Sequence, residues 1–293
     1  MSVPRGRPGQ DSAPDNKPRG WFPALVPRRC LKRELLDLPP DEQDSRALQG
    51  SLMDIRRVNL WLGGVGSALK ELALALGRME AAIPVPSPGG RGESDEKEAR
   101  RLKILDVAAG SADITAAMAG YAEDKGYAVF SVAADLNLAA LSAGRAWNRE
   151  PAARLQPVDR PQGNSEISYV LADGLRLPFP DGSFDIVHCS LVLHHLSRGD
   201  AVKFMAEMAR VSKFAIIIGD LRRNIIPWAL IWLLTRLFTA NRYTRCDGPL
   251  SVLKAFTPSE MRRLAEDAGI EDFRMRRRRF WRMSLLFFRD KEK

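Results

Sequence analysis

Residues that could bind a ligand or move a proton stand at the ends of short apolar runs in this sequence. The runs span 102–107, 127–135, 167–172 and 183–190. The first leads through Asp106 into a loop of small residues around Gly110, where a ligand could approach the backbone. The second ends in Asp135, whose carboxylate could accept hydrogen bonds from both hydroxyls of a ribose. The third precedes Asp173 and Gly174, which could meet the amino group and a ring nitrogen of adenine.

The fourth run brings in the candidates for proton transfer. It contains His188, which we interpret as structural because it lies inside a predicted strand, and it is followed by His194 and His195. Imidazole groups titrate near neutral pH, so either of the latter two could act as a general base. The alternative is that one of them only supports the next helix. Asp106 also has an alternative role, since it could bind loop amides rather than a ligand.

The loop after the first run differs from a dinucleotide phosphate loop. Its GxGxxG positions hold Ala108, Gly110 and Asp113. Because this set suits a pyrophosphate poorly, a nucleotide-dependent oxidoreductase is disfavoured. The sequence also lacks an evident metal-ligand cluster, so we expect no metal.

The elements that must position these residues alternate along the chain. Helices are predicted at 111–122, 138–148 and 199–211. Short apolar strands separated by helices specify a doubly wound α/β fold, in which a mostly parallel sheet is covered on both faces. Helix 258–268 then precedes two adjacent strands within 273–288, so an antiparallel C-terminal strand should complete a seven-stranded, Rossmann-like sheet. Ligands of such folds lie at the carboxyl ends of the strands.

Several segments resemble class I S-adenosylmethionine-dependent methyltransferases. These are ILDVAAGSAD (104–113), AADLN (133–137) and ADGLRLPFPDGSFDIVHCS (172–190), in the order and spacing of that family. The resemblance covers about residues 100–293 and implies S-adenosyl-L-methionine as the cofactor. It implies the following cofactor-binding residues: Asp106, Ala108 and Gly110 at the methionine end, Asp135 and Leu136 at the ribose, Asp173 and Gly174 at the adenine, and Ser190 beneath the cofactor. Ala108 and Ala112 replace the outer glycines of the family's usual GxGxG loop.

Within that family the chain resembles the methylases of ubiquinone and menaquinone biosynthesis. Segments 243–251 (YTRCDGPLS) and 255–261 (AFTPSEM) are similar to bacterial members with phenolic or lipid products. Those members carry histidine where this chain has Cys246, so a histidine base at that position does not carry over.

Composition divides the chain into three parts. The parts are residues 1–40, 41–99 and 100–293. The first is predicted to be a disordered basic arm, because its Pro, Gly and Arg residues, densest in 1–28, leave little to bury. The second holds two helices, the first capped by Asp41, and a linker rich in Pro and Gly over 84–100. The third is the methyltransferase-like part, and a domain boundary is expected near residue 100.

The net charge of +9 is confined to the ends of the chain. The first 30 residues hold six basic and two acidic residues, and residues 271–293 hold nine and four, whereas 31–270 are balanced at thirty each. The run Arg276 to Arg279 beside Phe280 could stack on bases, but a solvated strand and turn is the favoured interpretation. Nucleic-acid binding is therefore disfavoured.

A helical insert is expected at about 222–256, on the substrate side. Its segment 225–238, IIPWALIWLLTRLF, is apolar on nearly every side and too short to cross a bilayer. It could be a lid over the substrate, or it could touch a membrane surface through Trp228 and Trp232 and the arginines around them. Either role favours an aromatic or lipidic acceptor.

The cysteines point to a reducing compartment. Cys30, Cys189 and Cys246 are widely spaced and odd in number, and the first ten residues lack a hydrophobic signal core. We expect a cytoplasmic protein, with peripheral membrane contact as an option.

These observations favour one function over two alternatives. The chain is predicted to transfer a methyl group from S-adenosylmethionine to an oxygen or carbon of a hydrophobic small molecule that is phenolic, quinone-like or lipidic. His194 or His195 would remove a proton from the acceptor. The alternatives are an RNA methyltransferase that uses the basic termini and a noncatalytic module that binds S-adenosylmethionine.

Overall fold

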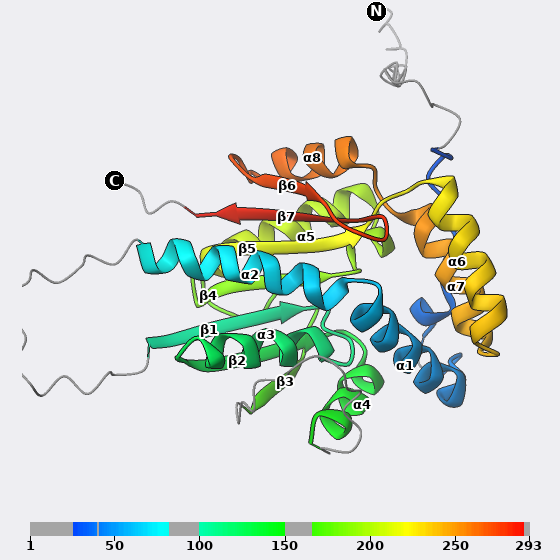
Figure 1. Cartoon of the computed structure of the whole chain (residues 1–293), viewed down its shortest axis with the longest axis horizontal. Helices are drawn as coiled ribbons and strands as arrows, with labels where there is room; N and C mark the ends of the chain where they lie inside the picture. The colour runs from blue at the N-terminus through cyan, green and yellow to red at the C-terminus, as the bar shows by residue number, and fades with distance from the viewer. Residues whose placement is uncertain (1–25, 40, 82–99, 150–165, 290–293) are drawn as a thin grey trace, which may run out of the picture.

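The computed structural model describes residues 26–39, 41–81, 100–149 and 166–289. Within them, seven strands form one sheet in the order β3-β2-β1-β4-β5-β7-β6 (Figure 1). The strands are β1 (Arg100–Val107), β2 (Tyr127–Asp135), β3 (Ile167–Leu171), β4 (Phe184–Ser190), β5 (Ser212–Leu221), β6 (Arg274–Arg277) and β7 (Arg282–Phe288). Strands β1 to β5 are parallel, whereas β7 is antiparallel to both β5 and β6. The predicted doubly wound sheet with an antiparallel C-terminal strand is confirmed.

The central strands are apolar on both faces. In β1, Leu102, Ile104, Leu105 and Val107 are at most 1% exposed. Successive side chains of a strand point to opposite faces, so the burial of Ile104 and Leu105 together means that helices cover both sides.

Two helix layers provide that cover. Helices α2 (Gly64–Ala81) and α3 (Asp113–Asp124) pack on one face, α5 (Arg198–Val211) and α8 (Pro258–Asp267) pack on the other, and α4 (Leu138–Arg149) lies beside β2 and β3 (Figure 1). Leu72 and Leu76 of α2 share a core with Leu102 and Ile104 of β1. The domain boundary expected near residue 100 is therefore wrong for the core, because α2 is one of its layers.

The remaining helices gather at the end of the sheet where β1 to β5 end (Figure 1). We call them, with the N-terminal segment 26–39, the cap. Its helices are the short η2 (Leu35–Asp37), α1 (Ser45–Trp61), α6 (Ile225–Phe238) and α7 (Arg242–Lys254). Helices α6 and α7 form the predicted insert. Asp44, rather than the predicted Asp41, caps α1, because its carboxylate accepts the N–H groups of Arg46 and Ala47.

The predicted disordered arm is wrong for its described part. In 26–39, the Arg29 guanidinium donates hydrogen bonds to the carbonyls of Lys254, His194 and Leu196, and Asp247 accepts the N–H groups of Leu35 and Leu36. The prediction considered only apolar burial, whereas hydrogen bonds and charge hold this segment. Residues 1–25 and most of the predicted linker lie outside the described residues.

Candidate active site

The loop after β1 has an unusual backbone built from small residues. Ala108, Gly110 and Ala112 all have left-handed φ values, 57°, 54° and 56°. A left-handed residue with a Cβ costs about 1–2 kcal/mol, so the two alanines hold strain that glycine would avoid. A Cβ added to Gly110 would meet nothing within 4 Å. The loop therefore borders open space at Gly110.

Asp135 at the end of β2 is tied to that loop. One carboxylate oxygen accepts the Gly110 N–H at 2.7 Å, and the other accepts the Asn137 N–H at 2.7 Å. Burial raises the pKa of Asp135, and these N–H donors oppose that effect. Leu136 beside it is 71% exposed. The predicted ribose residues thus stand at an accessible edge, with the carboxylate fixed in orientation.

Asp173 and Gly174 follow β3 on the same end of the sheet. Asp173 is exposed, and its carboxylate accepts the Leu175 N–H at 2.9 Å. A Cβ on Gly174 would lie 2.3 Å from the ring of Phe204 and 3.2 Å from Val107. Glycine is required there because α5 packs directly against the backbone, while the neighbouring carboxylate remains free to meet a ligand.

Asp106 is buried at the end of β1 and has two partners inside the protein. It is 2% exposed, accepts a hydrogen bond from Thr115 at 2.6 Å and pairs with Nδ1 of His188 at 2.7 Å. Each oxygen has a partner inside the protein and the carboxylate is buried, which favours the structural alternative, and a contact between Asp106 and the cofactor stays a prediction. His188 lies in β4, and this pair joins the two central strands, as a structural role requires.

A buried histidine–carboxylate pair follows β4 and β5. Nδ1 of His194 lies 2.7 Å from one oxygen of Asp220, and the other oxygen accepts the His194 backbone N–H at 3.1 Å. The two residues are 2% and 1% exposed. Burial alone would raise the pKa of Asp220, but the charge and hydrogen bond of His194 outweigh it, so that the pKa lies below its usual value. With Nδ1 engaged, Nε2 is the ring nitrogen left to accept a proton.

His195 is held by the cap instead. Its Nδ1 lies 2.9 Å from Asp37, and its ring centroid lies 4.3 Å from that of His194. Burial lowers the pKa of His195, but the hydrogen bond that its ring donates to Asp37 and the charge of Glu34 raise it above its usual value. Burial likewise raises the pKa of Asp37, yet His195 and Lys254 bring it down to about 2. The pair favours a charged imidazolium at His195.

Three of these residues could also hold a metal ion. Glu34, His194 and His195 each offer one ligand atom, and these atoms lie within 4.8 Å of one another. The ammonium group of Lys254 lies 3.1 Å from Glu34 and 3.2 Å from Asp37, so it already supplies positive charge to the same carboxylates. That no metal is needed stays a prediction.

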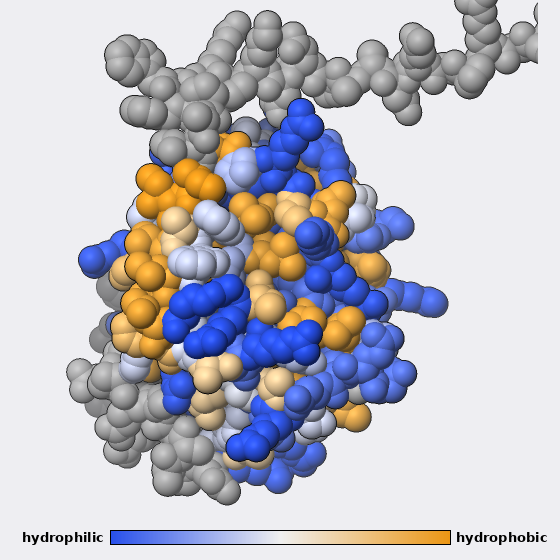
Figure 2. Space-filling model, turned by 90° about the vertical axis from the view of Figure 1, so that its right-hand side faces the viewer, coloured by the Kyte–Doolittle hydropathy of each residue, from blue (hydrophilic) through white to orange (hydrophobic). Residues whose placement is uncertain are grey.

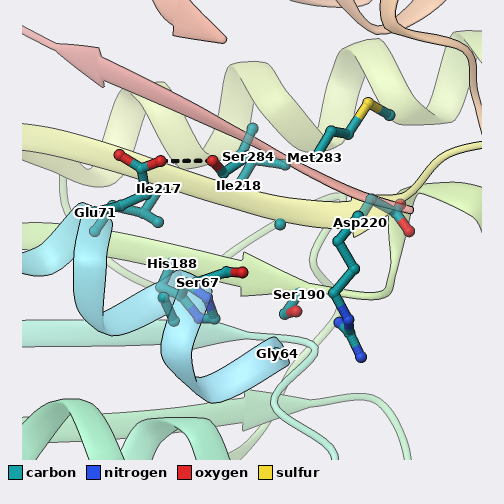
Figure 3. A pocket seen from close by; sticks show the side chains of 13 residues that line it. Gly64, Ser67, Glu71, His188, Ser190, Ile217, Ile218, Asp220, Met283 and Ser284 are labelled. Carbon is teal, nitrogen blue, oxygen red and sulfur yellow. Dashed lines mark hydrogen bonds between the residues drawn. The ribbon is translucent and has the colours of Figure 1, made fainter. Parts of the chain in front are cut away.

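Ser190, at the end of β4, lines a small space between the sheet and α2 (Figure 3). His188, Gly219 and Asp220 border it, together with Gly64 of α2. The space has room for about one water molecule. It therefore does not hold a cofactor as it stands, and Ser190 stays a predicted contact.

The same space is bordered by a buried ionic network that fixes α2 to the C-terminal strands. Glu71 is fully buried and accepts a hydrogen bond from Ser284 at 2.5 Å (Figure 3). It also forms ion pairs with Arg276 and Arg278. Two arginines of the predicted basic run thus have an internal structural role.

Sequence reasoning missed Glu34, Asp37, Asp220 and Lys254. Asp220 ends an apolar strand just as Asp135 does, so the same signal could have found it. Glu34 and Asp37 stand in the segment taken as an arm, and Lys254 stands at the end of α7. No local pattern marks these three, because they meet the histidines only through the folded cap.

Comparison with known proteins agrees with this geometry. Residues 105–214 match the family model of a methyltransferase domain. Ubiquinone/menaquinone biosynthesis C-methyltransferases of Shewanella oneidensis and of Shewanella baltica are 35% and 34% identical over 112 residues. Each match covers 38% of this chain and only 39% of the relative. A crystal structure of a SAM dependent methyltransferase from Aquifex aeolicus is similar, with a TM-score of 0.51 at 15% identity, over 82% of this chain and 97% of that one.

The matched region contains the 108–112 loop, Asp135, Asp173 and both candidate histidines. The solved structure supports the fold, and the sequence match supports the family. Residues 105–214 are therefore a methyltransferase domain of the class I S-adenosylmethionine-dependent type, similar to that of the ubiquinone/menaquinone biosynthesis C-methyltransferases.

Proposed function

We propose that this protein transfers the sulfonium methyl group of S-adenosylmethionine to an oxygen or carbon of a hydrophobic small molecule. The observation that carries the proposal is the juxtaposition of two features at the carboxyl ends of adjacent strands. One is the open loop at Gly110 with Asp135 fixed against it, and the other is the buried pair of His194 and Asp220. Strand order reverses between β1 and β4, where doubly wound folds bind their ligands.

The described residues fit the cofactor on the side of β1 to β3. Gly110 leaves space beside the loop, Asp135 has lone pairs beyond those used by its two N–H donors, and the Asp173 carboxylate is accessible. Asp135 would accept the ribose hydroxyls and Asp173 the adenine amino group. When bound, S-adenosylmethionine supplies an electrophilic methyl carbon on a positively charged sulfur.

The residues on the side of β4 and β5 fit the activation of an acceptor. Asp220 holds Nδ1 of His194, so Nε2 would accept the proton of a phenol or enol, and the ionised Asp220 would stabilise the imidazolium that forms. His195, whose raised pKa favours the charged form, would stabilise negative charge on the acceptor oxygen. His194 and Asp220 are 2% and 1% exposed, so their contact is shielded from bulk water.

The acceptor class rests on the cap and on the relatives. The insert 225–238 is rich in apolar side chains, and the relatives are named for ubiquinone and menaquinone biosynthesis. Both favour a phenolic, quinone-like or lipidic acceptor.

A labelling experiment tests this function. Purified protein is incubated with S-adenosylmethionine carrying a labelled methyl group, together with either an organic extract of cells or total RNA. At a limiting concentration of S-adenosylmethionine, we expect label in the organic phase with the wild-type protein and much less with Asp135→Ala. Calorimetry should show binding of S-adenosylhomocysteine. Label in RNA would overturn the acceptor class, and absence of cofactor binding would overturn the methyl transfer itself.

A further inference from the structure

The outer face of α6 is an exposed apolar stripe. Ile226, Leu230, Leu233 and Leu237 follow one another at intervals of four, three and four residues, and they are 43%, 42%, 46% and 66% exposed. This spacing places them on one side of a helix. Pro227 and Thr235 are the buried residues of the helix, so the stripe faces away from the protein.

The exposed apolar surface of α6 is wider than this single row of side chains. Trp232, Leu234 and Phe238 are also 45%, 37% and 78% exposed, so half of the fourteen residues of α6 are large apolar side chains in contact with solvent. Figure 2 shows this side of the molecule, on which hydrophobic side chains gather with hydrophilic ones among them. A soluble monomer rarely leaves such a patch uncovered.

The segment that carries the stripe is basic, although its Arg223 is buried and paired with Glu260. Residues 221–246 contain five arginines and no acidic residue. Arg236 and Arg242 are exposed, and the Arg236 guanidinium lies 5.0 Å from the centre of the Trp232 ring. An apolar helix with arginine and tryptophan at its border is typical of helices that lie in the interface of an anionic bilayer.

The turn between β6 and β7 extends this surface. Arg277, the last residue of β6, and Arg279 are exposed, and Phe280 is 46% exposed. The Trp281 carbonyl accepts the N–H of Arg222, three residues before α6. This turn lies at the same end of the sheet as the cap (Figure 1). The basic run that the sequence set apart thus adds two cations and an aromatic ring beside the helix.

We propose that α6 and the β6–β7 turn dock this protein on the surface of an anionic lipid bilayer. The apolar stripe would enter the boundary between headgroups and acyl chains, and the arginines would contact lipid phosphates. A second copy of the chain fits less well, because a twofold contact through α6 would bring the arginines of both copies together with no acidic partner from 221–246. The docking does not depend on the proposed methyl transfer.

Vesicle flotation tests the proposal with the full chain. We expect the wild-type protein to float with vesicles of phosphatidylcholine and phosphatidylglycerol, and to float less with phosphatidylcholine alone. The variant Leu233→Glu/Leu237→Glu should lower the affinity for anionic vesicles by about tenfold or more. The variant lacks two leucine side chains that would move from water into the bilayer. Arg236→Gln/Arg242→Gln should weaken the preference for anionic lipid and reduce its salt dependence.

The matched control is Leu74→Glu/Phe130→Glu, which places two acids at exposed apolar positions outside the cap. It should float like the wild type. Thermal melting and S-adenosylhomocysteine binding of every variant show that the domain is folded, and a failed methyl-transfer assay leaves the flotation result unaffected. Wild-type protein that stays in solution with anionic vesicles would overturn the proposal. So would a stripe variant that floats normally, or a concentration-dependent dimer lost in the stripe variant without any flotation.

Discussion

The cofactor side and the acceptor side of this site are built in different ways. On the cofactor side, Asp135 accepts the N–H groups of Gly110 and Asn137, and Asp173 accepts that of Leu175. Each contact therefore lies within one loop at a strand end or between two such loops. On the acceptor side, Asp37 reaches His195 across 158 residues of sequence and Lys254 across 217.

This difference has a physical consequence. The loops of the cofactor side and the pair of His194 and Asp220 are fixed at the ends of buried strands, whereas His195 is held by Asp37 of the cap. Stability is not uniform across a fold, and elements held by fewer buried apolar contacts open first. Changes in the cap should therefore alter turnover while leaving cofactor binding intact, and changes in the sheet loops should do the reverse.

His194→Ala should produce the largest difference between the effect on turnover and the effect on cofactor binding. Removing a general base costs about 100-fold or more in turnover, while the affinity for S-adenosylhomocysteine should stay nearly unchanged because His194 contacts Asp220 and not the predicted cofactor residues. Steady-state kinetics and calorimetry measure the two quantities. Asp220→Asn should lower turnover in the same direction. Wild-type turnover in His194→Ala would show that no base is needed there.

Asp135→Ala should produce the opposite pattern. The loss of a charged hydrogen-bond acceptor is expected to weaken S-adenosylhomocysteine binding by about 1.5–3 kcal/mol. Calorimetry with Asp135→Asn as the conservative control measures this loss. Equal affinity in the wild type and both variants would remove Asp135 from the cofactor site.

Arg29→Ala tests whether the N-terminal segment closes the acceptor side. Its guanidinium binds three carbonyls and stacks 3.8 Å from the centre of the Phe256 ring, so its loss should lower the free energy of unfolding by about 1–3 kcal/mol. Chemical denaturation measures the change. Arg28→Ala is the matched control, because Arg28 is exposed. If the two variants are equally stable, the segment contributes little.

The pair of Asp37 and His195 should make cap closure depend on pH. The pKa of Asp37 is lowered from 3.8 to about 2, so its contribution is present above pH 3.8 and is lost as the pH falls toward 2. The pKa of His195 is raised above 6.5, so its contribution is complete below pH 6.5 and is lost as the pH rises through the higher value.

The difference in melting temperature between the wild type and Asp37→Asn should therefore be largest between about pH 4 and 6.5. Since both side chains are partly exposed, the pair should contribute about 1 kcal/mol or less. A difference that does not change between pH 4 and 9 would contradict this coupling. The pH titration of His195 by NMR gives an independent measurement.

The smallest effect is expected on the cofactor side, from Ala108→Gly. Glycine relieves the left-handed strain of about 1–2 kcal/mol but loses about 0.4–1 kcal/mol through the greater freedom of the unfolded chain. The net stabilisation should be about 1 kcal/mol or less, measured by thermal unfolding, with unchanged cap-dependent turnover. A destabilised variant would show that the Ala108 methyl group packs better than its backbone conformation suggests.

Local pattern was sufficient for the sheet and for the cofactor side. Apolar runs of strand length ended in Asp135 and before Asp173, and both carboxylates stand where the runs placed them, because a parallel sheet brings consecutive carboxyl ends to one edge. The helices of the insert also follow from the sequence. The internal partners of Asp106 do not follow from the sequence, because Thr115 and His188 meet its two oxygens only in the folded chain.

Only the tertiary structure decided which residues of the cap join the acceptor side and which side chains form the outer surface. Glu34 and Asp37 belong to a segment whose composition indicates disorder, and they become part of the site because the fold places Lys254 and His195 beside them. Likewise, the sequence of α6 is apolar on nearly every side. Its packing against the rest of the protein determines which of its leucines remain exposed. Contacts between residues far apart in the sequence leave no periodic pattern in it. They form only when the whole chain folds, so no single segment indicates them.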